Sequence, residues 1–252
     1  MRIEQSYIPV RGVGETRERS LWEQGATHWS RFEPDLLGEK TGARVESFIE
    51  RAEPRLEAGD VSFFAREFPA DAQWRLYENF RDDTLFLDIE TTGLDHTRDV
   101  VTTVSMHRDG ETTTLVRGRD LTADRLQSHL EAAGLLGTFN GVQFDVPFLE
   151  AELGFDIDLP HLDLRFLSQR LGLTGGLKQI EGTIGIERDR PDISGRDAIR
   201  LWREYERGDQ AALDTLIEYN RADTVNLQDL LEVVVGRLDE DIRPDTWPGE
   251  NG

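Results

Sequence analysis

The sequence contains no cysteine in its 252 residues. Disulfide bridges, zinc ribbons and thiol nucleophiles are therefore excluded, and a chain of this length can bury a core without disulfides. It also lacks any run of about eighteen apolar residues, the length that a membrane helix requires. The first thirty residues are polar and acidic, unlike a signal peptide. We therefore expect a soluble, cytoplasmic protein with no membrane partner.

Lysine is almost absent, because only Lys40 and Lys178 occur among 29 basic residues. The 50 acidic residues bring the formal net charge to −21 and the pI to about 4.6. In dilute buffer such a charge opposes binding to nucleic acid. In molar salt the Debye length shrinks to about 3 Å, so carboxylates no longer repel a phosphate backbone at long range. The composition favours a halophilic protein that works in molar salt, and an acidic protein of dilute cytosol is the alternative.

The hydrophobic pattern changes abruptly near residue 80. Before it, charged runs with apolar residues three or four apart predict helices over 15–22 and 43–56. After it, short apolar or β-branched runs predict strands, with Asp109-Gly110 as a hairpin signal, at 85–89, 100–106, 112–116, 135–139 and 159–163. Amphipathic segments in the same half predict helices at 121–133, 146–153 and 210–237.

Three antiparallel strands followed by strands linked through helices indicate an α/β fold, with a mixed sheet flanked by helices. We predict three parts: a helical N-terminal appendage at 1–80, the α/β domain at 81–238 and a loose acidic tail at 239–252. The pattern leaves the strand order open.

Two carboxylates, Asp88 and Glu90, stand two residues apart on the first predicted strand, so their side chains emerge on the same face. Burying them without a positive partner is costly, and the strand supplies no lysine or arginine. Thr91-Thr92-Gly93-Leu94 follows at once, and its glycine allows close approach of a ligand. A metal ion is the natural partner, and two solvated acids at a strand end are the alternative.

Two further segments carry candidate groups. Asn140 to Asp145 follow the strand predicted at 135–139, and Asp145 would meet Asp88 and Glu90 if the two strands are parallel. Alone, Asp145 is an ordinary helix N-cap. Tyr219 and Asp223 are four apart in the last helix and therefore share a helix face.

These three segments, in this order and spacing, resemble the motifs of the DEDD 3′–5′ exonucleases of the ribonuclease H-like superfamily. Tyr219 lies four residues before Asp223, which is similar to the tyrosine subclass, whereas the histidine subclass would have histidine at Glu218. Residues 176–181, Leu201-Trp202 and residues 219–227 further resemble YprB-type ribonuclease H-like domains. The resemblance covers about residues 83–235 and implies a ribonuclease H-like mixed sheet.

The resemblance also implies the chemistry. Carboxylates without histidine or thiol suit Mg²⁺ or Mn²⁺, and two such ions can hold the attacking water and the leaving oxygen of a phosphodiester. Asp88 would bridge both ions, Glu90 and Asp223 would complete one, and Asp145 would hold the second. Tyr219 would orient the attacking water or help to deprotonate it. These residues are the predicted catalytic and metal-binding set.

Six further residues are predicted to contact the terminal nucleotide or its phosphate: Thr91, Gly93, Leu94, Asn140, Phe144 and Lys178. For Phe144 the alternative is a core position, and for Lys178 a helix-surface position. Asp163 and His161 are further candidates for metal ligands. We interpret them as structural because the four carboxylates already complete the metal site.

In the N-terminal part, the segment Val10–Gly14 opens into a helix that Gly25 closes. It is similar to the glycine hairpin of helix-hairpin-helix modules, in which backbone amides hold a phosphate. The match is partial, because Arg11 replaces the usual proline and Glu18 the usual small residue. Gly12 and Gly14 are therefore candidate phosphate-binding residues, and a plain helix cap is the alternative.

The sequence thus favours a metal-dependent 3′–5′ exonuclease that acts on the single-stranded 3′ end of a nucleic acid. A structure-selective endonuclease on the same scaffold and a nucleic-acid-binding module with an inactive site are the alternatives. Carboxylates and metal ions do not read the 2′-hydroxyl, so the choice between DNA and RNA stays open.

Overall fold

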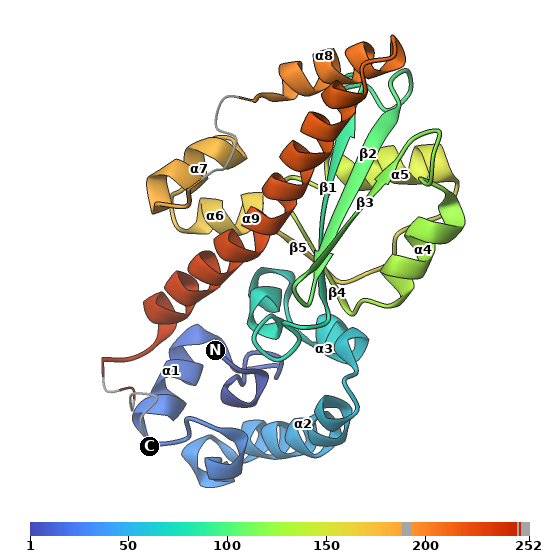
Figure 1. Cartoon of the computed structure of the whole chain (residues 1–252). Helices are drawn as coiled ribbons and strands as arrows, with labels where there is room; N and C mark the ends of the chain where they lie inside the picture. Colours follow the sequence, from blue (N-terminus) through green and yellow to red (C-terminus); the bar gives the residue numbers. More distant parts are fainter. Residues whose placement is uncertain (188–192, 246, 248–252) are drawn as a thin grey trace. The chain divides into compact units, whose positions relative to one another are not determined.

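The structure is a computed structural model that describes residues 1–187, 193–245 and 247. The chain forms two compact units, residues 1–81 with 235–252 and residues 82–234 (Figure 1). Most of the predicted tail beyond Asp245, namely residues 246 and 248–252, lies outside the described residues.

The first unit is helical in its described residues. Its α-helices and short 3-10 helices are η1 (Ile3–Gln5), α1 (Glu15–Glu23), η2 (Trp29–Arg31), η3 (Pro34–Leu36), α2 (Glu39–Glu57), α3 (Val61–Glu67) and η4 (Ala70–Leu76). The predicted helices over 15–22 and 43–56 correspond to α1 and α2. Gly14 is the N-cap of α1, and Gly25, with φ +95°, follows its C-cap.

A buried ion pair organises this unit. Glu18 of α1 and Arg75 of η4 are both buried, with 2.7 Å between Oε2 and Nη1. The other carboxylate oxygen of Glu18 accepts hydrogen bonds from the Ser6 hydroxyl and the backbone amides of Tyr7 and Ile8. The acidic residue that departs from the helix-hairpin-helix pattern therefore ties the preceding loop to the unit's core.

The second unit contains one mixed sheet in its described residues. The strands are β1 (Thr84–Thr91), β2 (Val101–Arg108), β3 (Glu111–Val116), β4 (Leu135–Thr138) and β5 (His161–Asp163), in the spatial order β3-β2-β1-β4-β5. Strands β1, β2 and β3 pair antiparallel, whereas β1, β4 and β5 pair parallel. The predicted α/β class and mixed sheet are confirmed. The parallel β1–β4 pair brings the carboxyl ends of both strands to one edge.

Helices cover both faces of this sheet: α4 (Ala123–Glu131), α5 (Asp145–Leu153), α6 (Leu164–Arg170), α7 (Leu177–Ile184), α8 (Gly195–Glu206) and α9 (Gln210–Ile242). The helices α4 and α5 pack on one face, and α9 crosses the other (Figure 1).

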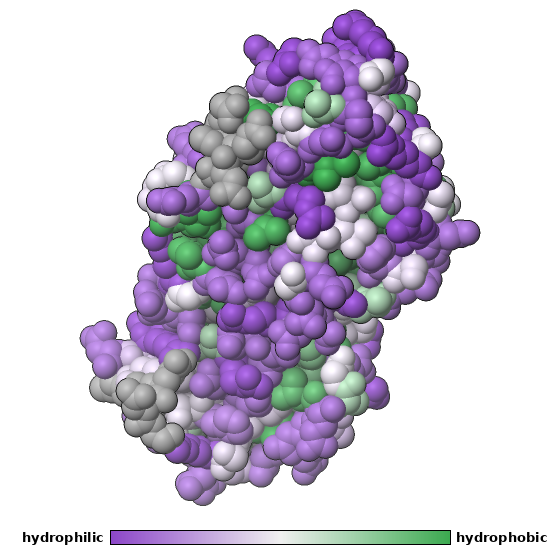
Figure 2. Space-filling model, viewed as in Figure 1, coloured by the Kyte–Doolittle hydropathy of each residue, from purple (hydrophilic) through white to green (hydrophobic). Residues whose placement is uncertain are grey.

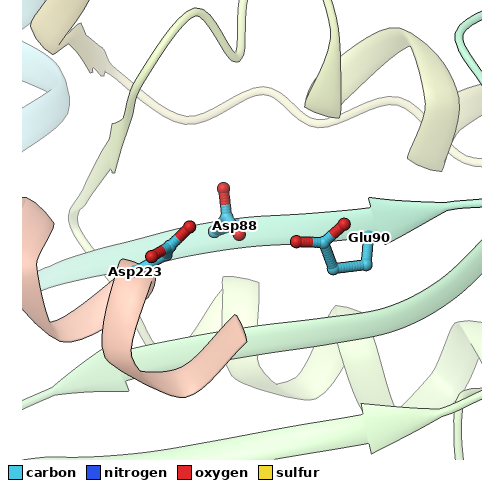
Figure 3. A group of neighbouring side chains, drawn as sticks. All are labelled: Asp88, Glu90 and Asp223. Atoms are coloured by element: carbon cyan, nitrogen blue, oxygen red, sulfur yellow. The ribbon is translucent and has the colours of Figure 1, made fainter. Parts of the chain in front are cut away.

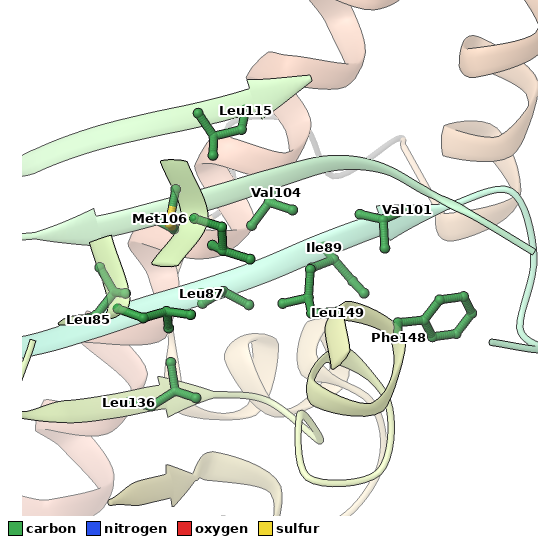
Figure 4. Packing of buried hydrophobic residues seen from close by; sticks show 12 residues of the cluster. Leu85, Leu87, Ile89, Val101, Val104, Met106, Leu115, Leu136, Phe148 and Leu149 are labelled. Carbon is green, nitrogen blue, oxygen red and sulfur yellow. The ribbon is translucent and has the colours of Figure 1, made fainter. Parts of the chain in front are cut away.

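Side chains along β1 alternate between the apolar core and the polar face of the sheet. Leu85, Leu87 and Ile89 point to the α4–α5 side and pack with Phe148 and Leu149 of α5 (Figure 4). The residues between them, including Asp88 and Glu90, point to the α9 side because strand side chains alternate. Burying the leucine and isoleucine face, at about 25 cal/mol per Å² of apolar surface, stabilises the sheet that carries both carboxylates.

Several predicted element ends differ from the structure, including those of α5 and α9. Asp145 is the first residue of α5 and Phe144 is its N-cap, so the alternative of an ordinary N-cap for Asp145 is wrong. The helix α9 continues to Ile242, past the predicted end at Arg237. Leu238 is buried and Arg243 donates a hydrogen bond to Asp239 at 2.7 Å, so packing and a side-chain contact extend the helix into the predicted tail.

Hydrophilic residues cover most of the face seen in Figure 2, with hydrophobic residues in small patches. No helix among the described residues is long and apolar enough to span a membrane.

Candidate metal centre

Three carboxylates from distant segments meet on the α9 side of the sheet. Carboxylate oxygens of Asp88, Glu90 and Asp223 lie within 4.8 Å of one another, and we call these residues the acidic cluster (Figure 3). The strand period of two puts Asp88 and Glu90 on one face, and α9 brings Asp223 to them. The cluster therefore joins the first and third sequence motifs.

Asp145 reaches the same region from α5. It is 4% exposed, and its Oδ1 accepts a hydrogen bond from the backbone amide of Ile89 at 3.2 Å. That amide lies between Asp88 and Glu90 in β1, so Asp145 is held against the strand that carries them. Because β1 and β4 are parallel, the segment that follows β4 arrives at the carboxyl end of β1.

Burial and neighbouring negative charge raise the pKa of three of these acidic residues, Asp88, Glu90 and Asp145. Burial first, and then the charges of Asp145 and Glu90, hold the pKa of Asp88 well above its usual range. Burial and the charge of Asp223 raise the pKa of Glu90 in the same way, against a lowering effect of Lys178. Burial raises the pKa of Asp145 to about 7. Ionising all four carboxylates together therefore needs additional positive charge.

Tyr219 and Lys178 border this cluster. Tyr219 is 5% exposed, and burial, the charge of Asp223 and a hydrogen bond to it raise the pKa of the phenol. The Lys178 ammonium lies 5.2 Å from the centre of the Tyr219 ring, within the range of a cation–π contact. Lys178 is half-buried at the start of α7.

Asn220 was not singled out from the sequence, yet it holds Asp88 in place. Its Nδ2 donates to Asp88 Oδ2 at 2.6 Å, and its Oδ1 accepts from the Thr103 hydroxyl of β2 at 2.9 Å. Asn220 is fully buried. Its helical spacing from Leu213, Leu216 and Ile217 places it on the apolar face of the last helix, and this was the available signal for its burial.

The loop after β1 forms one wall of a cavity of about 780 Å³ beside the cluster. Glu90, Thr91, Leu94 and Phe144 line it, together with Ser194, Arg196 and Ile199 from the start of α8. Leu94 is 83% exposed. Gly93 does not line the cavity, and a Cβ there would meet the Asp99 carboxylate, which would have to shift. The α8 residues were not predicted from the sequence.

The residues of the second motif have different roles, because some line the cavity and others hold the loop. Phe144 lines the cavity and also packs on Phe148, with ring centroids 4.8 Å apart. Asn140 adopts a positive φ of 66°, and its side-chain oxygen accepts a hydrogen bond from Arg165 at 2.5 Å. The Asn140 side chain therefore serves the loop, and it is absent from the cavity lining.

Asp163 and His161 are structural, as interpreted from the sequence. Asp163 accepts hydrogen bonds from the backbone amides of Asn140 and Val142 and caps α6. His161 contacts the Thr138 hydroxyl at 2.8 Å. Gly12 and Gly14 belong to the first unit.

A family model for the RNase H superfamily matches residues 85–235. The chain belongs to the RNase H superfamily. No curated protein matches the sequence. The match spans the sheet and all four acidic residues, and it confirms the predicted ribonuclease H-like fold.

Solved structures similar to this RNase H superfamily chain include Brucella melitensis NrnC bound to pGG. That comparison has 23% identity and a TM-score of 0.46, covering 66% of this chain and 78% of NrnC. NrnC with bound Mg²⁺ has 22% identity and a TM-score of 0.45, covering 66% and 79%. The family B DNA polymerase of the archaeon Pyrobaculum calidifontis has 19% identity and a TM-score of 0.50, covering 63% of this chain and 25% of the polymerase. This chain thus spans about a quarter of the polymerase, and the likeness concerns the fold alone.

Proposed function

We propose that the protein is a metal-dependent 3′–5′ exonuclease of the tyrosine DEDD type, related to YprB-type domains, with its activity in the domain predicted at 81–238. The observation that supports this most strongly is the acidic cluster, because three carboxylates converge on one face of the sheet and burial and mutual repulsion raise the pKa of Asp88 and Glu90. Such an arrangement is costly unless a cation binds.

The donor set fits Mg²⁺ or Mn²⁺. The acidic cluster offers carboxylate oxygens only, and hard divalent cations prefer oxygen ligands. Asp88, Glu90 and Asp223 would hold the metal, with Asp145 as the fourth ligand directly or through water. Two bound ions would supply activation of the attacking water and charge stabilisation at the leaving oxygen.

The remaining groups orient the reactants. In the metal-free protein, burial and the neighbouring carboxylates raise the pKa of Tyr219, so the protonated phenol can donate a hydrogen bond and position water. Acting as a base would require bound cations to lower that pKa. Asn220 holds the Asp88 carboxylate in one orientation. Lys178 supplies positive charge near Glu90, where a substrate phosphate would approach.

The cavity supports binding of the terminal nucleotide of a single strand. Its lining is mostly apolar, with Leu94 and Phe144 on one side and Ile199 of α8 on another, which suits the face of a nucleobase. Arg196 supplies a cation at the same cavity. Thr91 lines it beside Glu90, so a nucleotide seated there would present its phosphate near the acidic cluster.

We also propose that the protein works in molar salt. The two lysines among 29 basic residues and the charge of −21 support this. Assays therefore belong in molar KCl, where screening removes long-range repulsion between the acidic surface and the substrate.

The test is incubation with 5′-labelled single-stranded DNA and RNA in molar KCl with Mn²⁺ or Mg²⁺, beside Asp88→Ala and Asp223→Ala controls. A ladder that shortens from the 3′ end and is lost in both variants is the expected result. Discrete internal cuts would replace the proposal with an endonuclease. Intact substrate with a retarded band would indicate a binding module.

A further inference from the structure

In the first unit, the acidic and the basic residues of α2 lie on different sides of the helix. Its acidic residues recur at spacings of seven, four, three and four, at Glu39, Glu46, Glu50, Glu53 and Glu57. Its basic residues recur at spacings of four, seven and four, at Lys40, Arg44, Arg51 and Arg55. In a helix of 3.6 residues per turn each set forms its own stripe. A basic stripe therefore persists in a chain whose net charge is strongly negative.

A cavity of about 390 Å³ lies beside this stripe. Three arginines line it, Arg44 and Arg51 from α2 and Arg11 from the segment Val10–Gly14, and all three are exposed. Ser47 and Glu67 are also in the lining. The cavity thus gathers more positive than negative charge on a protein that is acidic overall.

Two of the three guanidinium groups have no acidic partner among the described residues. Arg51 pairs with Glu67 at 3.4 Å. Arg44 instead donates to the Arg11 backbone carbonyl at 3.4 Å, and neither Arg11 nor Arg44 takes part in an ion pair within the described part of the chain. Two uncompensated like charges on one cavity repel each other, and an external anion would relieve that repulsion.

The segment that carries Arg11 is held in one conformation. The Val13 amide donates to the Val10 carbonyl at 2.8 Å, closing a tight turn. Gly12 has φ +101°, a conformation that other residues rarely adopt, and its carbonyl accepts a hydrogen bond from Arg17. The Arg11 backbone is therefore fixed before any ligand arrives, which lowers the entropic cost of binding.

We propose that Arg11, Arg44 and Arg51 form a phosphate-binding site for the backbone of a nucleic-acid strand, separate from the acidic cluster. A guanidinium group forms two parallel hydrogen bonds to the oxygens of one phosphate, which suits a nucleic-acid backbone. The single aromatic residue in the lining, Phe48, is 2% exposed and offers no face to a base. The site therefore binds without sequence preference, and the choice of strand as ligand rests on the proposed nuclease function.

The test is fluorescence anisotropy with a labelled single-stranded 20-mer, in EDTA so that no cleavage occurs. Arg11→Gln/Arg44→Gln should weaken binding by at least fivefold and lower the slope of log affinity against log salt by about 1.4, for two lost phosphate contacts on a single strand. Arg31→Gln, an exposed arginine of the same unit outside the cavity, is the matched control and should bind like the wild type.

Inorganic phosphate and a mononucleotide are added as competitors to identify the anion. Competition only by polynucleotide supports a strand site, whereas full displacement by millimolar phosphate would assign the cavity to a free anion and overturn the strand proposal. Urea unfolding of each variant reports whether the fold is kept, and the single Arg44→Gln variant repeats the measurement if the double variant is destabilised.

The test of the phosphate-binding site can be told apart from the test of the nuclease function. Asp88→Ala tests the nuclease function and should leave the affinity of this site unchanged. Unaltered binding by Arg11→Gln/Arg44→Gln, with cleavage intact in the wild type, would overturn the site alone. Weaker binding by the same variant, in a protein that cleaves nothing, would keep the site and reject the nuclease.

Discussion

The side chain of Asn220 donates a hydrogen bond to the Asp88 carboxylate at 2.6 Å and accepts one from Thr103 at 2.9 Å. One buried amide therefore links α9, β1 and β2 behind the acidic cluster. Because the amide turns its donor to Asp88, it favours the ionised carboxylate and lowers the pKa that burial raises.

Asn220→Ala should weaken Mn²⁺ binding by about 10–100-fold, the usual effect of removing a group that orients a metal ligand. Calorimetric titration with Mn²⁺ measures it. Thr103→Val removes only the group that orients Asn220 and should have a smaller effect in the same direction. Equal Mn²⁺ affinity in Asn220→Ala and the wild type would show that Asp88 does not depend on this contact.

Tyr219→Phe should lower kcat by about 100-fold or more while Mn²⁺ affinity changes less than threefold. The phenol hydroxyl is lost, whereas the carboxylates and the ring packing remain. If the phenol only positions water, the shape of the pH–rate profile should be the same in the variant and the wild type. A profile that loses its alkaline limb in the variant would mean that the phenol acts as a base.

Stability without metal should fall as pH rises from the ordinary Asp value of 3.8 to about 7. In that window the folded protein keeps a proton on Asp145 that the unfolded chain has released, so raising the pH favours unfolding. Metal needs the ionised carboxylates, so the rise in Tm on adding Mn²⁺ should be larger at pH 8 than at pH 5.5. Thermal unfolding with EDTA or Mn²⁺ measures both.

Asp145→Asn is the control for this pH dependence, and its metal-free Tm should decline less steeply over the same window. An identical Mn²⁺ effect at pH 5.5 and pH 8 would contradict coupling between these carboxylates and the metal.

Leu94→Ala should raise KM for single-stranded substrate by about tenfold, through lost apolar contact with the terminal nucleotide. The free energy of unfolding should change by less than about 0.5 kcal/mol, because Leu94 is 83% exposed. Val142→Ala, at a residue 48% exposed and outside the cavity lining, should leave KM unchanged. A similar KM in Leu94→Ala and the wild type would remove Leu94 from the substrate site.

Arg75→Met should destabilise the protein by about 3 kcal/mol, because it leaves the Glu18 carboxylate buried without its ion-pair partner. The amides of Tyr7 and Ile8 still donate hydrogen bonds to Glu18. The loss of stability should therefore be near the lower end of the range for a broken buried ion pair. Arg55→Met breaks the more exposed pair with Asp60 and should cost no more than about 1 kcal/mol. Urea unfolding of both variants measures the difference.

Local periodicity explains what the sequence alone could predict. A spacing of two on a strand puts Asp88 and Glu90 on one face, and a spacing of four on a helix aligns Tyr219 with Asp223, whatever surrounds them. The strands at 85–89, 112–116 and 135–139 are apolar or β-branched enough to be recognised one by one. The α/β class therefore needed no tertiary information, whereas the choice of the four acidic residues as one set came from the resemblance of their three segments to a known family.

Contacts between segments far apart in the chain required the fold. The contacts of Asn220 with Asp88 and Thr103 depend on how α9 lies across β1 and β2, although its spacing already placed it on the apolar face of the helix. The place of Arg196 at the cavity depends on where α8 begins, and the meeting of Arg11 with Arg44 depends on the turn at Gly12. Helical and strand periods determine which residues share a face, but only packing between elements determines which faces meet.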